Sequence, residues 1–527
     1  MMKRIEIFDT TLRDGAQSEG ISYSVGDKVK IVKILDKFGI DVIEAGFPAS
    51  NPKDEELFSR LKSEKLVHSK LAAFSSTLHA GEDPETSPSM KKLLSAGTPV
   101  VVVFGKASSE QVREVLKISG GENLDLIRRT IGYLKEKGKE VVFDAEHFYR
   151  GAKDDPEYTF RVLGCAASSG ADTLCLCDTT GAVIPSDASA LTKEAVRRFP
   201  DKKIAVHFHD DIGCAAANSL LAAEAGAAQI QGTFLGIGER CGNADLSVIM
   251  PSLVFKLGYT LDCDMRDLRK TANAVSEISN TRIRNNKPYI GKSAFYHKAG
   301  MHIDAVKKYP PSFEHIDPAL VGNERKFVLS EFSGRNTLLD RVRKLVPGAD
   351  KDSEELSLAV QALKENELFG YHYEAAEASF ELLLRRILYK YEPHFNIILH
   401  KTTDDFPSAN GELTSCSVVQ IEAGGRTEMG CSLGNGPVNA LDNALRRALS
   451  TFYPEVENIK LVDFKVRVID ATTTTAAKVR VLMESTDGEG FWTTVGVSFD
   501  IIEACLQALQ DSYEYKLLNS SQKHLQN

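Results

Sequence analysis

The feature that most constrains the fold is a series of eight short apolar runs in the first half of the chain, separated by stretches with the spacing of amphipathic helices. The runs lie at 5–8, 42–45, 71–74, 100–104, 141–143, 173–177, 204–208 and 228–231. Such alternation is typical of a parallel sheet covered by helices, either a doubly wound open sheet or a closed barrel. Eight repeats in roughly 250 residues, with polar groups directly after several runs, favour an α/β fold of the (β/α)8 TIM-barrel type.

The composition is that of a globular protein with more than one domain. The chain has 527 residues, of which 43% are hydrophobic and 26% charged. Its net charge of −9 and the lack of a Lys/Arg-rich run argue against a nucleic-acid or anionic-membrane partner. No run approaches about 18 apolar residues, so we expect no transmembrane helix. Nine scattered cysteines without a CxxC pair, and a strand-like start at residues 5–8 in place of a signal peptide, predict free thiols in a cytoplasmic protein.

Three regions follow from the change in pattern along the chain. Residues 1–260 hold the barrel repeats, whereas residues 261–390 combine helical stretches and polar loops with little strand signal. Residues 391–520 contain an internal repeat, at 417–449 and 478–513, in which two alternating strands joined by a glycine-bearing turn precede a helix. We therefore predict a catalytic barrel, a mainly helical adapter and an α+β domain of duplicated ββα units. Such a module is suited to self-association or to binding a small ligand, and a plain packing appendage is the alternative.

Two histidines mark the strongest candidate site. His207 and His209 lie at the end of the seventh run, and side chains two apart on a strand point to the same face. Barrels of this type carry their active sites at the C-terminal ends of the strands. A single histidine would more often be structural, but two at this spacing and place favour metal ligation.

Oxygen ligands for the same metal follow the first and eighth runs. Asp14 is the candidate carboxylate, and Asn243, at the end of the glycine-rich loop 236–243, is the candidate amide. Arg13 is placed to stabilise negative charge on a substrate oxygen, although a surface Arg–Asp pair is the plain alternative. A mixed nitrogen and oxygen set without thiolates suits Mg²⁺, Mn²⁺ or Zn²⁺.

Further acidic residues fall at the same end of the predicted barrel. Glu44 ends the second run, Asp144 and Glu146 follow the fifth, and Asp178 follows the sixth. Charged groups that point into a barrel mouth are costly unless they are paired or bind a ligand. Their convergence from several strands therefore indicates an active site.

These residues together resemble the acyl-CoA-dependent Claisen-condensing enzymes of the metal-dependent barrel lyase superfamily, which include the 2-isopropylmalate, homocitrate and citramalate synthases. The similarity extends over nearly the whole chain, and its motifs stand at 9–15, 44–48, 207–210, 238–243, 300–302 and, in the last region, 434–440. Within this group the chain is most similar to the citramalate synthases, through residues 143–149, 176–179, 314–318 and 321–325.

The resemblance implies a condensation of acetyl-CoA with pyruvate that yields (R)-citramalate and CoA, a step towards isoleucine. It also implies a homodimer whose last region is an allosteric domain with isoleucine as effector. The roles that it implies are metal ligation by Asp14, His207, His209 and Asn243, catalysis by Arg13, Glu146, His302 and Asp304, and substrate binding by Gln17, Glu44 and Thr180. In this scheme His302 moves a proton and Asp304 orients it.

The chain departs from the family pattern at one position of consequence. Many members have a tyrosine in a Thr-Tyr-Glu segment after the motif histidine, whereas this chain has Ser312, Phe313 and Glu314. Either Tyr309, four residues earlier, takes its place or the hydroxyl is dispensable, so we assign no catalytic tyrosine. Three alternatives to a citramalate synthase remain: a 2-isopropylmalate synthase, an aldol-cleaving lyase or biotin-linked carboxyltransferase on the same barrel, and a catalytically inactive amino-acid sensor.

Overall fold

The computed structural model describes residues 3–327, 335–389, 391–404, 415–469, 477–488 and 490–526. The chain forms two compact units, which are considered separately. The first comprises Met1–Phe295 and Glu314–Arg325, and the second comprises Tyr296–Phe313 and Lys326–Asn527.

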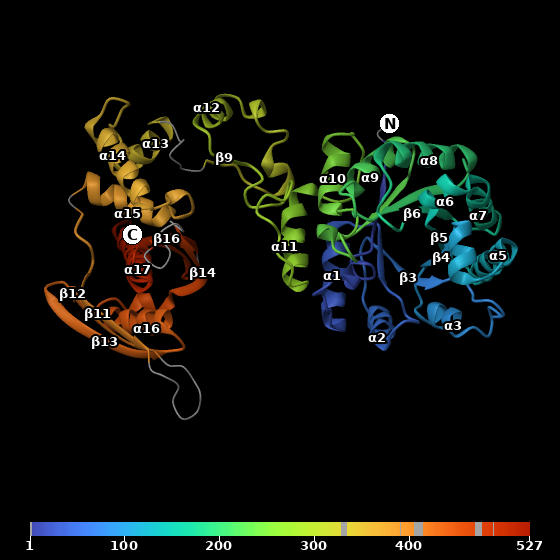
Figure 1. The fold of residues 1–527 in the computed structure, drawn as a ribbon, viewed down its shortest axis with the longest axis horizontal. Helices are drawn as coiled ribbons and strands as arrows, with labels where there is room; N and C mark the ends of the chain where they lie inside the picture. Colours follow the sequence, from blue (N-terminus) through green and yellow to red (C-terminus); the bar gives the residue numbers. More distant parts are fainter. Residues whose placement is uncertain are drawn as a thin grey trace. The chain divides into compact units, whose positions relative to one another are not determined.

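The first unit is built on a closed barrel of eight parallel strands, as predicted (Figure 1). Strand β1 pairs with β8, which closes the sheet. The strands are β1 (Glu6–Asp9), β2 (Val42–Gly46), β3 (Lys70–Ser76), β4 (Val100–Lys106), β5 (Glu140–Glu146), β6 (Thr173–Asp178), β7 (Lys203–Phe208) and β8 (Gln229–Gly232). Each predicted run therefore became one strand, with ends that differ by three residues at most.

Helices surround the barrel (Figure 1). They are α1 (Val25–Phe38), α2 (Pro52–Leu61), α3 (Pro88–Ser95), α4 (Ser109–Gln111), α5 (Gly120–Glu136), α6 (Phe148–Asp154), α7 (Pro156–Ser168), α8 (Pro185–Arg198), α9 (Ala215–Glu224), α10 (Leu246–Phe255) and α11 (Leu268–Ile278). Local sequence fixes several of their ends. Ser24 and Asp27 form a reciprocal capping box at the start of α1, and Gly39 ends that helix with φ 100°, a conformation that glycine adopts without strain.

The barrel has two apolar layers, because neighbouring residues of a strand face opposite sides. On β6, Leu174 and Leu176 pack outward against the helices, whereas Cys175 and Cys177 belong to the cluster inside the barrel with Phe8. The interior is therefore packed along most of its length, and the polar site residues occupy the C-terminal ends of the strands.

The second unit begins with a helical part. Two short strands, β9 (Tyr296–His297) and β10 (Lys326–Phe327), pair in parallel. The helices of this part are α12 (Gly300–Lys308), α13 (Arg335–Leu345), α14 (Glu354–Phe369) and α15 (Glu377–Leu388). Helices α13 to α15 share a core that also contains Val495 and Val497 from the last part of the chain. The helical part therefore folds against the repeat that follows it.

The predicted ββα repeat is present, and each copy has one more strand in front of it. The first copy consists of β11 (Asn396–Asp404), β12 (Ser415–Ala423), β13 (Arg426–Gly434) and α16 (Pro437–Ser450), and the second of β14 (Lys460–Val468), β15 (Val479–Thr486), β16 (Phe491–Ser498) and α17 (Ile501–Gln526). Both sheets are antiparallel. A Cβ at Gly430 would collide with the carbonyl oxygen of Ala444, and one at Gly496 with that of Ala504. A glycine in the last strand of each copy thus lets each helix lie directly on its sheet.

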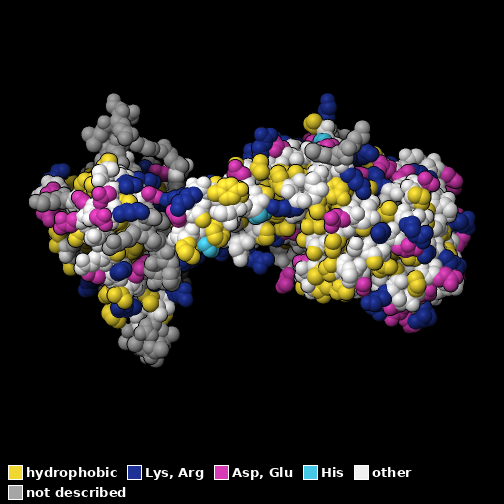
Figure 2. Space-filling model, turned by 90° about the horizontal axis from the view of Figure 1, so that it is seen from above, with side chains coloured by type: hydrophobic (Ala, Val, Ile, Leu, Met, Phe, Trp, Pro, Cys, Tyr) yellow, Lys and Arg dark blue, Asp and Glu magenta, His cyan; other side chains and the backbone are white. Residues whose placement is uncertain are grey.

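The surface and the thiols agree with the composition. Figure 2 shows basic and acidic side chains interspersed over the visible face of the molecule. All nine cysteines lie within the described residues, and none of them forms a disulfide. Among the helices of the described ranges, none is long and apolar enough to cross a bilayer.

Candidate metal centre and active site

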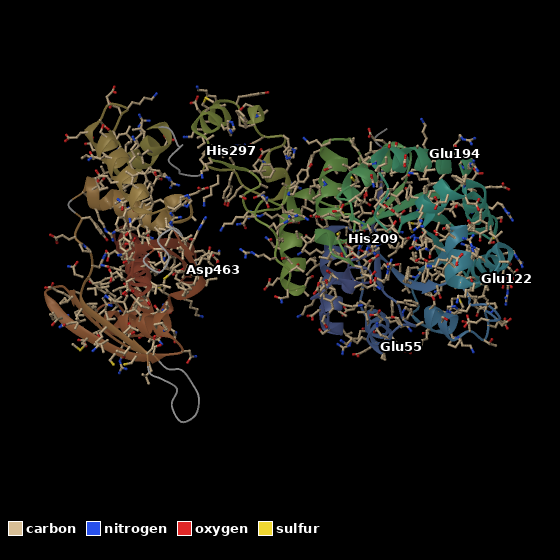
Figure 3. The ribbon with its side chains drawn as sticks, viewed as in Figure 1. Glu55, Glu122, Glu194, His209, His297 and Asp463 are labelled. Carbon is tan, nitrogen blue, oxygen red and sulfur yellow. The ribbon has the colours of Figure 1, made fainter. Side chains whose placement is uncertain are left out.

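Three predicted ligands meet at the C-terminal end of the barrel. The Asp14 Oδ2 atom lies 3.2 Å from His207 Nε2 and 3.8 Å from His209 Nε2. All three side chains are buried, and one potential ligand atom of each lies within 4.8 Å of the others. Strand β7 ends at Phe208, so the two histidines flank its last residue. His209 is labelled in Figure 3. The sequence therefore identified a real cluster, formed by residues nearly 200 positions apart.

The orientation of His207 depends on a residue that the sequence did not reveal. The Gln231 Oε1 atom lies 3.1 Å from His207 Nδ1, and Gln231 comes from the neighbouring strand β8. A glutamine oxygen accepts a hydrogen bond, so it favours a proton on Nδ1. Burial lowers the pKa of His207, but the hydrogen bond from its Nε2 to Asp14 outweighs burial and raises that pKa, so Nε2 would offer its lone pair to a metal only after losing its proton. The one feature of the sequence that could have indicated this role is that Gln231 is a polar residue within an apolar run.

Asn243 supplies an oxygen that has no partner within the part of the chain that the structure describes. Its Nδ2 donates to the backbone oxygen of Ile237 at 3.2 Å, while its buried Oδ1 accepts no hydrogen bond. Asn243 also forms a backbone bridge with His209, which places the two residues side by side. A Cβ at Gly238 would collide with the Asn243 amide, so the glycine-rich loop is needed for this approach. A buried amide oxygen without a partner is costly unless it binds a ligand.

The electrostatics of this cluster favour a cation. Burial disfavours the Asp14 carboxylate, but Arg13 and His207 outweigh it and hold the pKa of Asp14 well below its usual range. Burial and the neighbouring His207 lower the pKa of His209 to about 4, so its imidazole is neutral at pH 7. Charged carboxylate, neutral imidazole and free amide oxygen are donors that Mg²⁺, Mn²⁺ and Zn²⁺ accept. The residues present therefore fit a divalent metal.

Arg13 lies between two acidic side chains. Its Nε donates to Glu44 Oε2 at 2.6 Å and its Nη1 to Asp14 Oδ2 at 3.1 Å. The guanidinium carbon lies 3.9 Å from the centre of the Phe74 ring. Burial raises the pKa of Glu44 to about 7 in spite of Arg13, and Glu44 Oε1 has no hydrogen-bond partner among the described residues. Arg13 is thus a fixed cation beside the candidate metal ligands, not a surface residue.

Glu146 ends β5 and is held by neighbours that the sequence did not indicate. Lys106 Nζ lies 2.6 Å from Glu146 Oε2, and His147 Nε2 lies 3.8 Å from Glu146 Oε1. The His147 backbone has φ 60°, and its N–H donates to Thr179 Oγ1 at 2.9 Å, which joins the loops after β5 and β6. Lys106 ends β4, and this position at a strand end is the only feature of the sequence that could have indicated its role at the site.

The other predicted substrate contacts are less enclosed. Thr180 is half-buried in the loop after β6, and Gln17 is exposed at the end of the short helix Gly15–Gln17. Both follow strands at the same end of the barrel as Asp14.

His302 and Asp304 belong to the second unit and so lie outside the cluster that the barrel assembles. His302 is exposed on α12, and its ring stacks on Phe313 with 4.0 Å between the ring centres. Asp304 pairs with Lys308 at 2.6 Å. Residues two apart on a helix do not face each other, so α12 does not bring Asp304 to His302. Tyr309 is 65% exposed.

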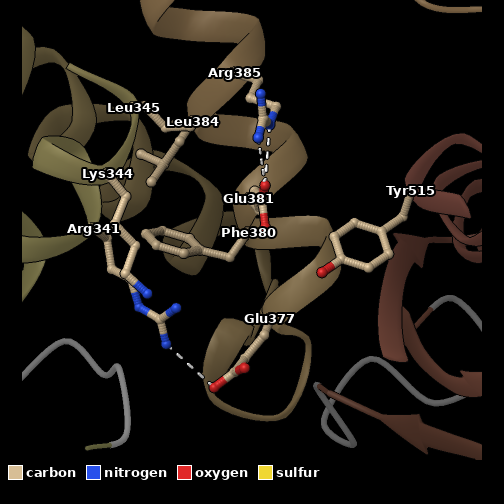
Figure 4. A pocket seen from close by; sticks show the side chains of 9 residues that line it. All are labelled: Arg341, Lys344, Leu345, Glu377, Phe380, Glu381, Leu384, Arg385 and Tyr515. Atoms are coloured by element: carbon tan, nitrogen blue, oxygen red, sulfur yellow. Dashed lines mark hydrogen bonds and ion pairs between the residues drawn. The ribbon is translucent and has the colours of Figure 1, made fainter. Parts of the chain in front are cut away.

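A separate cavity of about 180 Å³ lies within the second unit (Figure 4). It is lined by residues of α13 and α15 and by Tyr515 of α17. Arg341 lies 3.4 Å from Glu377, and Arg385 lies 2.7 Å from Glu381. Both carboxylates of the wall are therefore already paired with arginines of the same wall.

Comparison with known proteins defines the family. The family model described as HMGL-like matches residues 4–275, the homocitrate synthase post-HMGL domain-like model matches 289–367, and the LeuA allosteric (dimerisation) domain matches 374–517. The (R)-citramalate synthase of Aquifex aeolicus is 44% identical over 99% of both chains. The chain belongs to the (R)-citramalate synthase family.

Other sequence relatives are consistent with that placement. Five (R)-citramalate synthases are 40–44% identical over nearly the whole chain. The 2-isopropylmalate synthase of Lysinibacillus sphaericus is 30% identical over 99% of both chains. Among solved structures, the HMG-CoA lyase of Bacillus subtilis aligns with 53% of this chain and 95% of its own, at 22% identity and a TM-score of 0.47.

Proposed function

We propose that this chain is an (R)-citramalate synthase, which condenses acetyl-CoA with pyruvate to give (R)-citramalate and CoA for isoleucine biosynthesis in the cytoplasm. The observation that carries the proposal is identity of 40–44% to (R)-citramalate synthases over nearly the whole chain, against about 30% to 2-isopropylmalate synthases. The buried Asp14, His207 and His209 cluster supports an active enzyme, since an inactive sensor would have no use for such costly groups.

The metal ligands are Asp14, His207, His209 and Asn243. A divalent metal bound there would act as a Lewis acid that polarises the keto group of the oxo acid. Gln231 fixes the tautomer of His207, and Ile237 fixes the Asn243 amide, so both donors are preorganised before substrate arrives. This preorganisation supports a resident metal over a transient one.

Arg13 stabilises the alkoxide that forms as the new carbon–carbon bond closes. Its guanidinium is held by Glu44 and stacked on Phe74, so it meets the developing charge without reorganising. Glu44, Gln17 and Thr180 line the substrate position, and Thr180 contacts the substrate carboxylate. Glu146, fixed by Lys106, helps to place or move protons.

His302 removes the proton from the acetyl methyl group with a ring nitrogen, and the resulting enolate attacks the keto carbon of pyruvate. Water afterwards cleaves the thioester to release CoA. The ring is exposed and is oriented by stacking on Phe313, which stands where many family members have tyrosine. For Asp304 to orient His302, the ion pair between Asp304 and Lys308 must first open.

The enzyme is expected to prefer pyruvate to 3-methyl-2-oxobutanoate, with a kcat/KM ratio of at least about tenfold. One extra methylene in an apolar pocket is worth about 1–3 kcal/mol, and the branched acid carries two more methyl groups. Aromatic rings support this preference: Phe74, beneath Arg13, stacks on Phe104 at 5.2 Å and contacts Phe47 edge-on at 5.5 Å.

The measurement is CoA release with a panel of 2-oxo acids, for the wild type and for Phe104→Ala. We expect Phe104→Ala to lower the ratio of kcat/KM for pyruvate to kcat/KM for 3-methyl-2-oxobutanoate, because the variant has more room for the branched acid. A higher kcat/KM for 3-methyl-2-oxobutanoate in the wild type would make the chain a 2-isopropylmalate synthase, which is the second candidate function.

The regulatory roles follow the domain division predicted from the sequence: a catalytic barrel at 1–260, an adapter at 261–390 and an allosteric, dimerising domain at 391–520. The match to the LeuA allosteric (dimerisation) domain supports the last of these. So does a row of exposed apolar side chains on β14, which a second copy would cover: Leu461, Val462, Phe464, Val466 and Val468, exposed by 37–53%.

Isoleucine is expected to bind the C-terminal domain and to inhibit from there. An effector bound outside the barrel can inhibit only by binding two states of the enzyme with different affinities. We expect hydrogen exchange of the full-length chain to slow in residues 415–469 and 490–518 when L-isoleucine is added. D-isoleucine is the matched control.

The full-length chain is the right material for this test, because Val495 and Val497 share a core with α13 to α15 and a truncation near Tyr389 would expose that core. Protection by L-isoleucine confined to the barrel would place the effector site there and contradict the proposal. Protection confined to α13 and α15 would point to the cavity of Figure 4 instead.

A further inference from the structure

Two thiols and a carboxylate form a second cluster inside the barrel, and the reaction proposed above makes no use of the thiols. Cys175 and Cys177 point inward from β6, and Asp144 points inward from the neighbouring strand β5. One potential ligand atom of each lies within 4.8 Å of the others, and all three residues are buried. Cys177 is the register partner of His207 on β7, so this cluster lies next to the metal centre already described.

The spacing of the sulfur atoms matches the bite of a tetrahedral cation. Cys175 Sγ and Cys177 Sγ are 3.9 Å apart. Two thiolates bound to zinc at about 2.3 Å with a tetrahedral angle are separated by roughly 3.8 Å. Residues two apart on a strand hold this separation through the backbone, so the site needs little rearrangement to bind.

Asp144 provides an independent indication of a ligand. Its side chain is buried and hydrogen-bonds with Cys175, but its Oδ1 atom has no hydrogen-bond partner within the described residues. An unpartnered carboxylate oxygen deep in a protein is costly unless it coordinates something. Together the three side chains offer two sulfur donors and one oxygen donor at a single point.

We propose that Asp144, Cys175 and Cys177 form a second cation site, selective for a thiophilic divalent ion such as Zn²⁺ or Cd²⁺. Soft sulfur donors distinguish it from the nitrogen and oxygen set of Asp14, His207, His209 and Asn243, which also accepts hard ions such as Mg²⁺. On binding, each thiol releases its proton to solvent and two metal–sulfur bonds form, so charge and atoms balance without any redox partner.

Occupancy of the second site inhibits the enzyme. Asp144 interacts electrostatically with both Arg13 and His207, so a cation bound to Asp144 removes negative charge that stabilises the first site. The inhibition rests on the proposed function, whereas the binding itself does not.

The test is a Cd²⁺ titration of the full-length enzyme in excess Mg²⁺, followed by sulfur-to-cadmium charge-transfer absorption. That absorption requires thiolate ligands, so Cd²⁺ at the histidine site does not produce it. We expect about one equivalent of Cd²⁺ with this absorption in the wild type and loss of it in Cys175→Ala/Cys177→Ala. The matched control, Cys263→Ala/Cys505→Ala, also removes two buried thiols and should keep the wild-type titration.

Equal absorption in the wild type and a folded Cys175→Ala/Cys177→Ala variant would overturn the proposal. If that variant does not fold, the cadmium NMR shift of wild-type protein decides, because sulfur ligands shift it differently from nitrogen and oxygen. A shift typical of nitrogen and oxygen ligands alone would then overturn it. Absorption with unchanged activity would refute only the inhibition, and absorption in an enzyme inactive towards every 2-oxo acid would refute only the proposed function.

Discussion

Replacing His207 and His209 together by alanine is expected to abolish metal retention and citramalate formation while the barrel stays folded. The variant leaves Asp14 and Asn243 as the only predicted ligands. Loss of one residue that merely orients a ligand typically costs about 10- to 100-fold in metal affinity, so loss of two ligands should cost far more. The barrel persists because its apolar layers, inside and outside the strands, involve neither imidazole.

The measurements are metal content per chain after gel filtration, CoA release with pyruvate, and circular dichroism. His79→Ala is the matched control, because His79 is an exposed histidine of the same unit. A graded variant, Gln231→Leu, keeps all four ligands but removes the partner of His207 Nδ1, so we expect a loss of about 10- to 100-fold in metal affinity. Metal content and activity equal to those of the wild type in the double variant would show that the metal binds elsewhere.

The sequence predicted the barrel well because each of its strands is a short apolar run, and these runs alternate regularly with amphipathic helical stretches. The ends of those strands could also be predicted, and in a parallel barrel all of these ends lie on one side. His207, His209 and Asp14 could therefore be assigned to one site without knowledge of any distance. The same rule placed Glu44 and Asp144 at that end.

Other features could not be predicted, because they depend on which side chains meet across strands. Gln231 looks like an ordinary polar residue of β8, and only the structure brings its oxygen to His207. Lys106 reads as a surface lysine, yet it pairs with Glu146. Strands β11 and β14 were missed because they are edge strands with both faces largely exposed, so neither has the buried apolar face that marks a strand in a sequence.

Replacement of Arg13 is expected to give the largest loss of turnover among single variants that keep the metal. Arg13→Lys keeps the positive charge but loses the planar fork that reaches Glu44 and Asp14 at once. Removal of one preorganised group that stabilises an oxyanion costs about 10²–10³ in kcat. We therefore expect kcat for pyruvate to fall by roughly that factor, with metal content unchanged and little change in KM, because the interaction is made mainly in the transition state.

A second pair of variants separates catalysis from stability. Arg13→Met alone leaves the buried Glu44 carboxylate without its cation, and breaking a buried pair in this way costs about 3–5 kcal/mol of unfolding free energy at a pH well above 7, where Glu44 stays ionised. Arg13→Met/Glu44→Gln removes both charges. We therefore expect urea unfolding to show that the double variant regains most of the unfolding free energy that Arg13→Met loses. Turnover should stay low in the double variant, because the cation that meets the alkoxide is still missing. If the double variant instead regained wild-type kcat, Arg13 would serve only to neutralise Glu44, and alkoxide stabilisation would have to come from another group in the barrel.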